Sequence, residues 1–116
     1  TQPASTSPAA LGLLRTTMGW QGLVLTDSLS AGAIADAGLT VPVAAARAVE
    51  AGADVVMFGS TLTARDIAAL APASVAQETA AIVAALTSAV NTAQLSRARL
   101  VDAATQVLAA KGAKLC

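Results

Sequence analysis

An aspartate at the end of an apolar run is the clearest candidate for chemistry in this chain. Gly22–Leu25 is apolar, Asp27 follows two residues later, and the polar loop Ser28–Gly32 comes next. This pattern predicts a buried strand that delivers a carboxylate to its C-terminal end. In parallel α/β folds that end of a strand usually carries the chemistry. From the pattern alone, Asp27 is either a reactive carboxylate or an aspartate that caps the loop after the strand.

The sequence lacks the residues and motifs that other common types of catalytic or cofactor site require. The chain has no histidine and one cysteine, Cys116, so neither a metal site nor a Ser-His-Asp triad is expected within it. Its glycines do not match a phosphate-binding or dinucleotide-binding loop, so no cofactor is expected. Asp54 begins the next predicted strand, opposite the end at which parallel α/β folds usually place their chemistry, and is expected to make a structural contact. Arg15 is interpreted as a helix-surface or salt-bridge residue, and Trp20 as a packing residue.

Composition excludes some classes of partner. The 116 residues include seven basic and seven acidic side chains, so the zero net charge does not favour nucleic acid or an anionic membrane. The most apolar stretch, Val41–Phe58, is interrupted by three charged residues and is not expected to span a bilayer. Only 12% of the residues are charged while 55% are hydrophobic, which suggests that part of the surface is covered by something outside this sequence.

Helical and strand patterns alternate in the first half of the chain. Ser7 followed by Pro8 predicts a helix start, because serine caps free amides and proline is tolerated in the first turn. A strand is predicted at 22–27, a helix over Thr40–Gly52 and a second buried strand at 54–58. This order indicates an α/β fold with a parallel sheet.

The second half is predicted to be helical. Thr63 with Asp66 resembles a capping box, apolar residues recur at helical spacing between 75 and 90, and Ser96 is expected to cap a last helix. Two buried strands do not make a stable parallel sheet by themselves. The sheet is therefore expected to continue in residues upstream of Thr1 or in a partner chain.

Several segments together resemble glycoside hydrolase family 3, and within it the β-N-acetylglucosaminidase branch. These segments are 3–8, 13–15, 18–20, 22–30 and 51–54, and Leu95–Lys111 is similar to the closing helix of the family. The resemblance implies the C-terminal portion of a TIM (β/α)8-type barrel, with two parallel strands and at least four helices, incomplete on its own. Residues 1–70 would form the last βα units and residues 71–116 the closing helices.

The same resemblance implies a function and two site residues. It implies a retaining glycoside hydrolase that removes terminal β-linked N-acetylglucosamine, with turnover of peptidoglycan fragments as the usual role. Asp27 would be the nucleophile, and Ser30 would bind substrate unless its hydroxyl only stabilises the turn. Family members of this branch take their acid/base from an upstream histidine, so this chain alone is expected to be inactive. Ser28 and Ala31 depart from the family, which often has a second acid and a methionine there.

Two other functions are open alternatives. One is a β-glucosidase or β-xylosidase of the same family, and the other is a non-catalytic helical interaction module whose strands dock on a partner sheet. The expected partners are a carbohydrate substrate and the remainder of the barrel, with no nucleic acid and no membrane span. The compartment is open between the bacterial cytoplasm and an exported or cell-envelope location.

Overall fold

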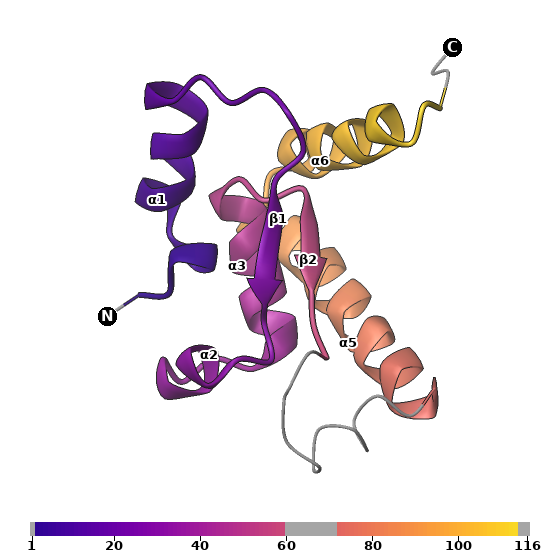
Figure 1. Cartoon of the computed structure of the whole chain (residues 1–116). Helices are drawn as coiled ribbons and strands as arrows, with labels where there is room; N and C mark the ends of the chain where they lie inside the picture. Colours follow the sequence, from indigo (N-terminus) through magenta and orange to yellow (C-terminus); the bar gives the residue numbers. More distant parts are fainter. Residues whose placement is uncertain (1, 60–71, 114–116) are drawn as a thin grey trace.

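The computed structural model describes residues 2–59 and 72–113, which form a two-stranded parallel sheet and five α-helices. The strands are β1 (Leu25–Ser28) and β2 (Val55–Met57). The α-helices are α1 (Pro8–Gly12), α2 (Gly32–Asp36), α3 (Val41–Ala51), α5 (Pro72–Asn91) and α6 (Arg97–Ala110). A 3₁₀ turn, η1 (Ala4–Thr6), precedes α1, and a π-helical turn, η2 (Leu13–Thr17), follows it. The predicted α/β class and parallel strands are confirmed (Figure 1).

Local signals in the sequence place the helix starts correctly. The Ser7 hydroxyl accepts a hydrogen bond from the Ala10 amide at 3.3 Å, and the Ser96 hydroxyl accepts one from the Arg99 amide at 3.1 Å. Both are N-cap bonds that satisfy amides without an intrahelical partner. The short helix α2 was not predicted, since its five residues lie in a stretch that reads as loop. The predicted Thr63 capping box, the boundary after residue 70 and Cys116 lie outside the described residues.

β1 begins three residues later than predicted, and side chains bind the backbone that leads into it. The Arg15 guanidinium donates to the carbonyl of Gly22 at 2.6 Å, and the Trp20 indole donates to the carbonyl of Leu23 at 3.3 Å. Regular ladder pairing therefore starts only at Leu25, which pairs with Val55. Trp20 itself is 49% exposed, and its ring lies against Gly22 in the turn before β1. Its expected packing between helix and strand stays a prediction.

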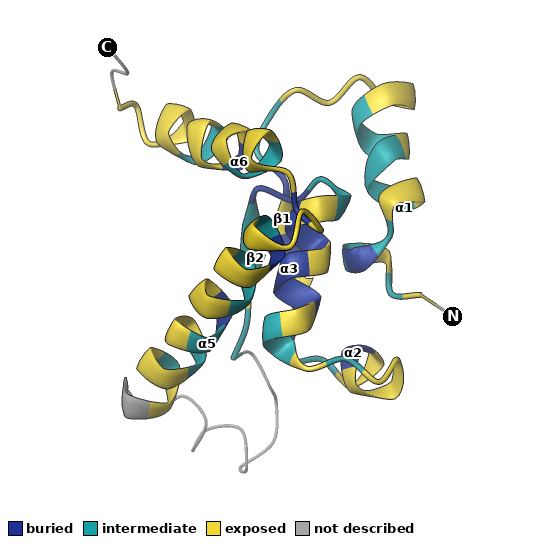
Figure 2. Cartoon of the chain, turned by 180° about the vertical axis from the view of Figure 1, so that it is seen from behind, coloured by how far each residue is buried: buried dark blue, intermediate teal, exposed yellow. Residues whose placement is uncertain are grey.

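Helix α3 is the centre of the core. Its buried residues are Ala44, Ala45, Ala46, Ala48 and Val49. The small alanine side chains let α5 pack closely on α3, and Ile82 and Ala89 of α5 complete two clusters with α3. Seen from behind the strands, α3 is the most buried helix, while α5 and α6 expose their outer faces (Figure 2). In the part of the chain that the structure describes, no helix is long and apolar enough to cross a membrane.

The described helices cover one face of the sheet. α3 and α5 lie behind β1 and β2, and no described element lies over the opposite face (Figure 1). Leu25 is 51% exposed and Met57 is 42% exposed, whereas Thr26 and Ser28 are buried. The prediction that both strands are fully buried is therefore wrong for this chain. The reason is that the described helices cover one face of the sheet, whereas apolar side chains such as Leu25 and Met57 point to the uncovered face.

Gly52, which ends α3, adopts a backbone conformation that favours glycine. Its φ is 125° and ψ is 5°, and an added Cβ would lie 3.5 Å from the Cβ of Leu11, an ordinary contact. The cost of Gly52→Ala is therefore conformational, and we expect a loss of about 1–3 kcal/mol in the free energy of unfolding. Urea unfolding measures this loss as a lower midpoint with an unchanged slope.

The matched control for this prediction is Gly12→Ala. Gly12 has a helical φ of −62°, and a Cβ there would meet no atom within 4 Å. We expect this variant to gain roughly 0.4–1 kcal/mol, because alanine reduces the freedom of the unfolded chain. Equal stability changes in the two variants would show that the conformation of Gly52 is not strained for alanine.

Candidate active site at the carboxyl end of β1

A cleft of about 470 Å³ lies beside β1 and contains the predicted site residue Asp27. Its walls come from η1, α1, β1 and the start of α2. All four residues of β1 line this cleft. The cleft is open to solvent, and its volume lies within the range of small-molecule sites, which starts at about 300 Å³.

The Asp27 carboxylate is exposed and mostly free of protein partners. Its Oδ1 atom accepts a hydrogen bond from the backbone amide of Ser28 at 2.7 Å. Within residues 2–59 and 72–113, no salt bridge and no other hydrogen bond to this carboxylate is found. One oxygen is thus held by the following residue, and the second remains available. Such a group can act as a nucleophile, as a base or as a ligand for a sugar hydroxyl.

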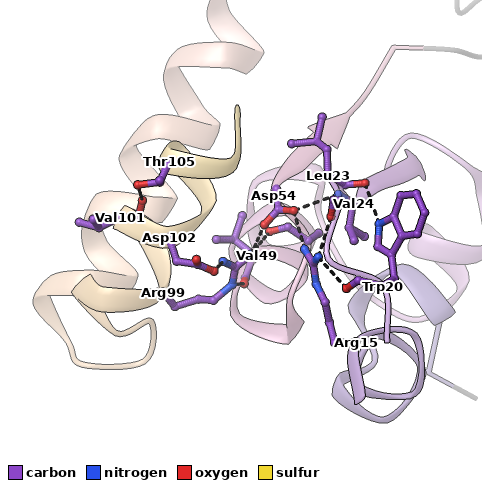
Figure 3. A network of polar contacts seen from close by, with 12 residues as sticks. Arg15, Trp20, Leu23, Val24, Val49, Asp54, Arg99, Val101, Asp102 and Thr105 are labelled. Carbon is purple, nitrogen blue, oxygen red and sulfur yellow. Dashed lines mark hydrogen bonds and ion pairs between the residues drawn. The ribbon is translucent and has the colours of Figure 1, made fainter. Parts of the chain in front are cut away.

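Asp54 contrasts with Asp27 at the opposite end of the sheet. Its side chain has no exposed surface and binds the Arg15 guanidinium at 2.6 Å and the Arg99 guanidinium at 2.7 Å. It also accepts a hydrogen bond from the Val24 amide at 2.9 Å. Figure 3 shows the two guanidinium groups approaching Asp54 from opposite sides. The predicted structural role of Asp54 and the predicted salt bridge of Arg15 are confirmed, and neither residue is available for chemistry.

Ser30 joins the loops that follow the two strands. Its hydroxyl accepts a hydrogen bond from the Gly59 amide at 2.9 Å, and its own amide donates to the hydroxyl of Ser28 at 3.3 Å. Ser30 does not line the cleft that holds Asp27. The structure therefore gives its hydroxyl a loop contact, while the expected contact with substrate stays a prediction.

One residue of the site was missed at the level of sequence. Thr26 lies between two exposed residues of β1, is 5% exposed, and its hydroxyl accepts a hydrogen bond from the Met57 amide at 3.0 Å. A threonine in a strand is ordinary, and nothing in its spacing distinguishes this one. The position matters because it directly precedes Asp27.

The sequence matches the model of a known protein family over most of its length. The sequence model described as the glycosyl hydrolase family 3 N terminal domain matches residues 1–110. Among curated proteins no relative matches. Similar solved structures include LpqI of M tuberculosis, at 28% identity and a TM-score of 0.72 over 98% of this chain and 30% of that chain.

Two more distant structures share the fold. One is a fungal multi-domain family 3 β-N-acetylglucosaminidase with a GCN5-related glucosamine N-acetyltransferase region. It has 24% identity and a TM-score of 0.71 over 94% of this chain and 11% of its own. The other is CbsA from Thermotoga neapolitana, at 20% identity and a TM-score of 0.64 over 90% and 20% of the two chains. This chain thus spans 11% to 30% of the length of these three structures.

Proposed function

The chain belongs to glycosyl hydrolase family 3, and from this premise we propose that it supplies the catalytic nucleophile, Asp27, of a retaining glycosidase. The observation that carries the proposal is the free, exposed carboxylate at the carboxyl end of β1. An aspartate with a structural role forms ion pairs with other side chains of the protein, as Asp54 does with two arginines. Among the described residues Asp27 has one hydrogen bond, to the Ser28 amide, so its charge is available to a substrate.

We propose that the two strands are the last strands of a (β/α)8 barrel whose other strands lie upstream of Thr1. In such a barrel the helices form an outer ring and the inner face of each strand points to the barrel interior. The helices within residues 2–59 and 72–113 cover one face of β1 and β2 and leave the other face open. Asp27 is exposed on that strand at its carboxyl end, where barrel enzymes place their active sites.

The mechanism that follows has two steps. The free oxygen of Asp27 attacks the anomeric carbon while an acid protonates the departing glycosidic oxygen, and a covalent glycosyl-enzyme forms. Water, deprotonated by the same acid/base, then attacks that carbon and releases the sugar with its original configuration. The Ser28 amide holds the other carboxylate oxygen and so fixes the plane of attack. The chain contains no histidine, so a histidine acid/base would have to come from the residues that complete the barrel.

The substrate that we propose is a terminal β-linked N-acetylglucosamine, with peptidoglycan fragments as its source. The support is the strand-and-loop signature around Asp27, which resembles that branch of the family. One of the similar structures is also described as a β-N-acetylglucosaminidase. β-Glucosides and β-xylosides are the alternative substrates within the family, so the test must include all three glycosides.

The test compares the 116-residue chain with the complete enzyme, meaning this chain together with the residues that complete the barrel. The complete enzyme is expected to hydrolyse an aryl β-N-acetylglucosaminide faster than the aryl β-glucoside and β-xyloside. The chain alone is expected to be slower by at least about 10²–10⁴-fold, because it lacks the acid/base. Release of the aryl group, followed by absorbance, measures both rates.

A natural disaccharide serves as the stricter substrate in this comparison, since aryl groups leave with little help from an acid. Equal rates for the chain and the complete enzyme would contradict the proposed division of the barrel. If the complete enzyme prefers β-glucosides, the proposed nucleophile stands and the proposed substrate is wrong. A complete enzyme that hydrolyses none of the three glycosides would refute the proposed function.

A further inference from the structure

The pairing of β1 with β2 is irregular between Leu25 and Ser28, the stretch that contains Thr26 and Asp27. Leu25 pairs with Val55 and Ser28 pairs with Met57, so three steps along β1 face two steps along β2. One extra residue in one strand is a β-bulge, which bends the strand and changes the direction of the side chains there. Asp27 lies inside this bulge.

The Thr26 hydroxyl holds the irregular pairing together. Its Oγ1 atom accepts the Met57 amide at 3.0 Å, while the Met57 carbonyl accepts the Leu29 amide at 2.8 Å. Met57 is thus bound on both sides of the bulge, once by a side chain and once by backbone. Thr26 is 5% exposed, so water has little access to take its place.

The bulge in turn sets the position of the carboxylate. Thr26 points to the covered side of the sheet, and Asp27 is exposed next to it in the cleft. The Ser28 amide, which is part of the same bulge, binds Asp27 Oδ1 at 2.7 Å. Movement of the backbone at Thr26 would therefore move both the Cα of Asp27 and the amide that orients its carboxylate.

We propose that Thr26 is a positioning residue for the nucleophile. Its hydroxyl stabilises the bulge, and the bulge orients Asp27 toward the cleft. This inference rests on the proposed function of Asp27. Catalysis by a nucleophile depends on its placement more than on binding strength, and a misplacement of 1 Å can cost about 100-fold in rate. Thr26 itself lines the cleft, but its hydroxyl is bound by the Met57 amide, so loss of the hydroxyl is expected to lower kcat more than it raises KM.

The experiment replaces Thr26 in the complete enzyme by valine and by serine. Thr26→Val has the same shape without the acceptor, and we expect kcat to fall about 10- to 100-fold with KM within about threefold. Thr26→Ser keeps the hydroxyl and should retain kcat within about threefold, which a loss of packing alone would not produce. The rate of covalent labelling of Asp27 by a fluorosugar should follow kcat in both variants.

Ser96→Ala is the control for a general loss of stability. It removes the N-cap of α6, which lies outside the cleft, and should lower the melting temperature without changing kcat. If Thr26→Val does not fold, Thr26→Ala takes its place, and a low kcat for alanine beside a normal kcat for serine supports the inference.

Two results separate the inference from the proposed function beneath it. If Asp27→Asn is inactive while Thr26→Val or Thr26→Ala keeps the kcat of the unsubstituted enzyme, the inference is wrong and the nucleophile stands. If Asp27→Asn retains full activity, the proposed function itself fails. Equal kcat losses in the serine and valine variants would also overturn the inference, because the hydroxyl would then not be the group that matters.

Discussion

Replacing Asp27 by asparagine is expected to remove nearly all turnover from the complete enzyme. Asparagine keeps the size of the side chain and can still accept the hydrogen bond from the Ser28 amide. It cannot form the glycosyl ester, since the amide is a poor nucleophile without the negative charge. We expect kcat to fall on the order of 10⁴-fold or more, the scale found when a hydrolase loses its nucleophile.

The stability of this variant should hardly change. Asp27 is exposed and has no salt bridge among the described residues, so the free energy of unfolding should stay within about 0.5 kcal/mol. Asp36→Asn is the matched control, because Asp36 is an exposed carboxylate outside the Asp27 cleft. Its kcat should equal that of the unsubstituted enzyme.

Mass spectrometry gives an independent check on the nucleophile. A mechanism-based fluorosugar should remain attached to the peptide that contains Asp27, and Asp27→Asn should not be labelled. A label on another carboxylate, or full activity in Asp27→Asn, would mean that a different group forms the glycosyl-enzyme.

The sequence predicted those features that depend on neighbouring residues. The helix starts at Pro8 and Arg97 follow from serine caps whose effect is local, and both caps make the expected hydrogen bond. The order of helices and strands follows from the change in hydrophobic period along the chain. The position of Asp27 after an apolar run placed it correctly at the carboxyl end of β1.

Features that depend on distant residues could not be predicted in this way. Arg15 and Arg99 reach Asp54 across 39 and 45 residues of chain, and no spacing rule connects positions so far apart. Arg15 also binds the carbonyl of Gly22, three residues before β1 begins. The bulge at Thr26 is a property of the pairing between two strands, so neither strand shows it alone.

The two aspartates differ in their surroundings, and we propose opposite roles for them. Asp54 precedes β2 and binds two arginines and a backbone amide. Asp27 lies near the carboxyl end of β1, where the Ser28 amide is its one hydrogen-bond donor among the described residues. This division resembles the general pattern of barrel enzymes, in which the amino ends of strands contribute stability and the carboxyl ends contribute chemistry.

Replacing Asp54 by alanine is expected to cause the largest loss of stability among these variants. The variant leaves the guanidinium groups of Arg15 and Arg99, which are only 25% and 18% exposed, without their shared anion. It also leaves the Val24 amide without its acceptor. Breaking a buried pair by removing one partner costs about 3–5 kcal/mol. Domains of this size are stable by only about 5–15 kcal/mol, so urea unfolding should show a much lower midpoint.

Asp102→Ala is the matched control, because it breaks a salt bridge of the same arginine at the surface. The Asp102 side chain is 60% exposed where it meets Arg99. Exposed pairs contribute roughly 0–1 kcal/mol, so this variant should unfold close to the unsubstituted protein. If the two variants lose equal stability, the arginine pair does not stabilise the fold through Asp54. If only Asp54→Ala unfolds early, α6 and η2 depend on this one buried carboxylate, since Arg99 and Arg15 join them to the start of β2 (Figure 3).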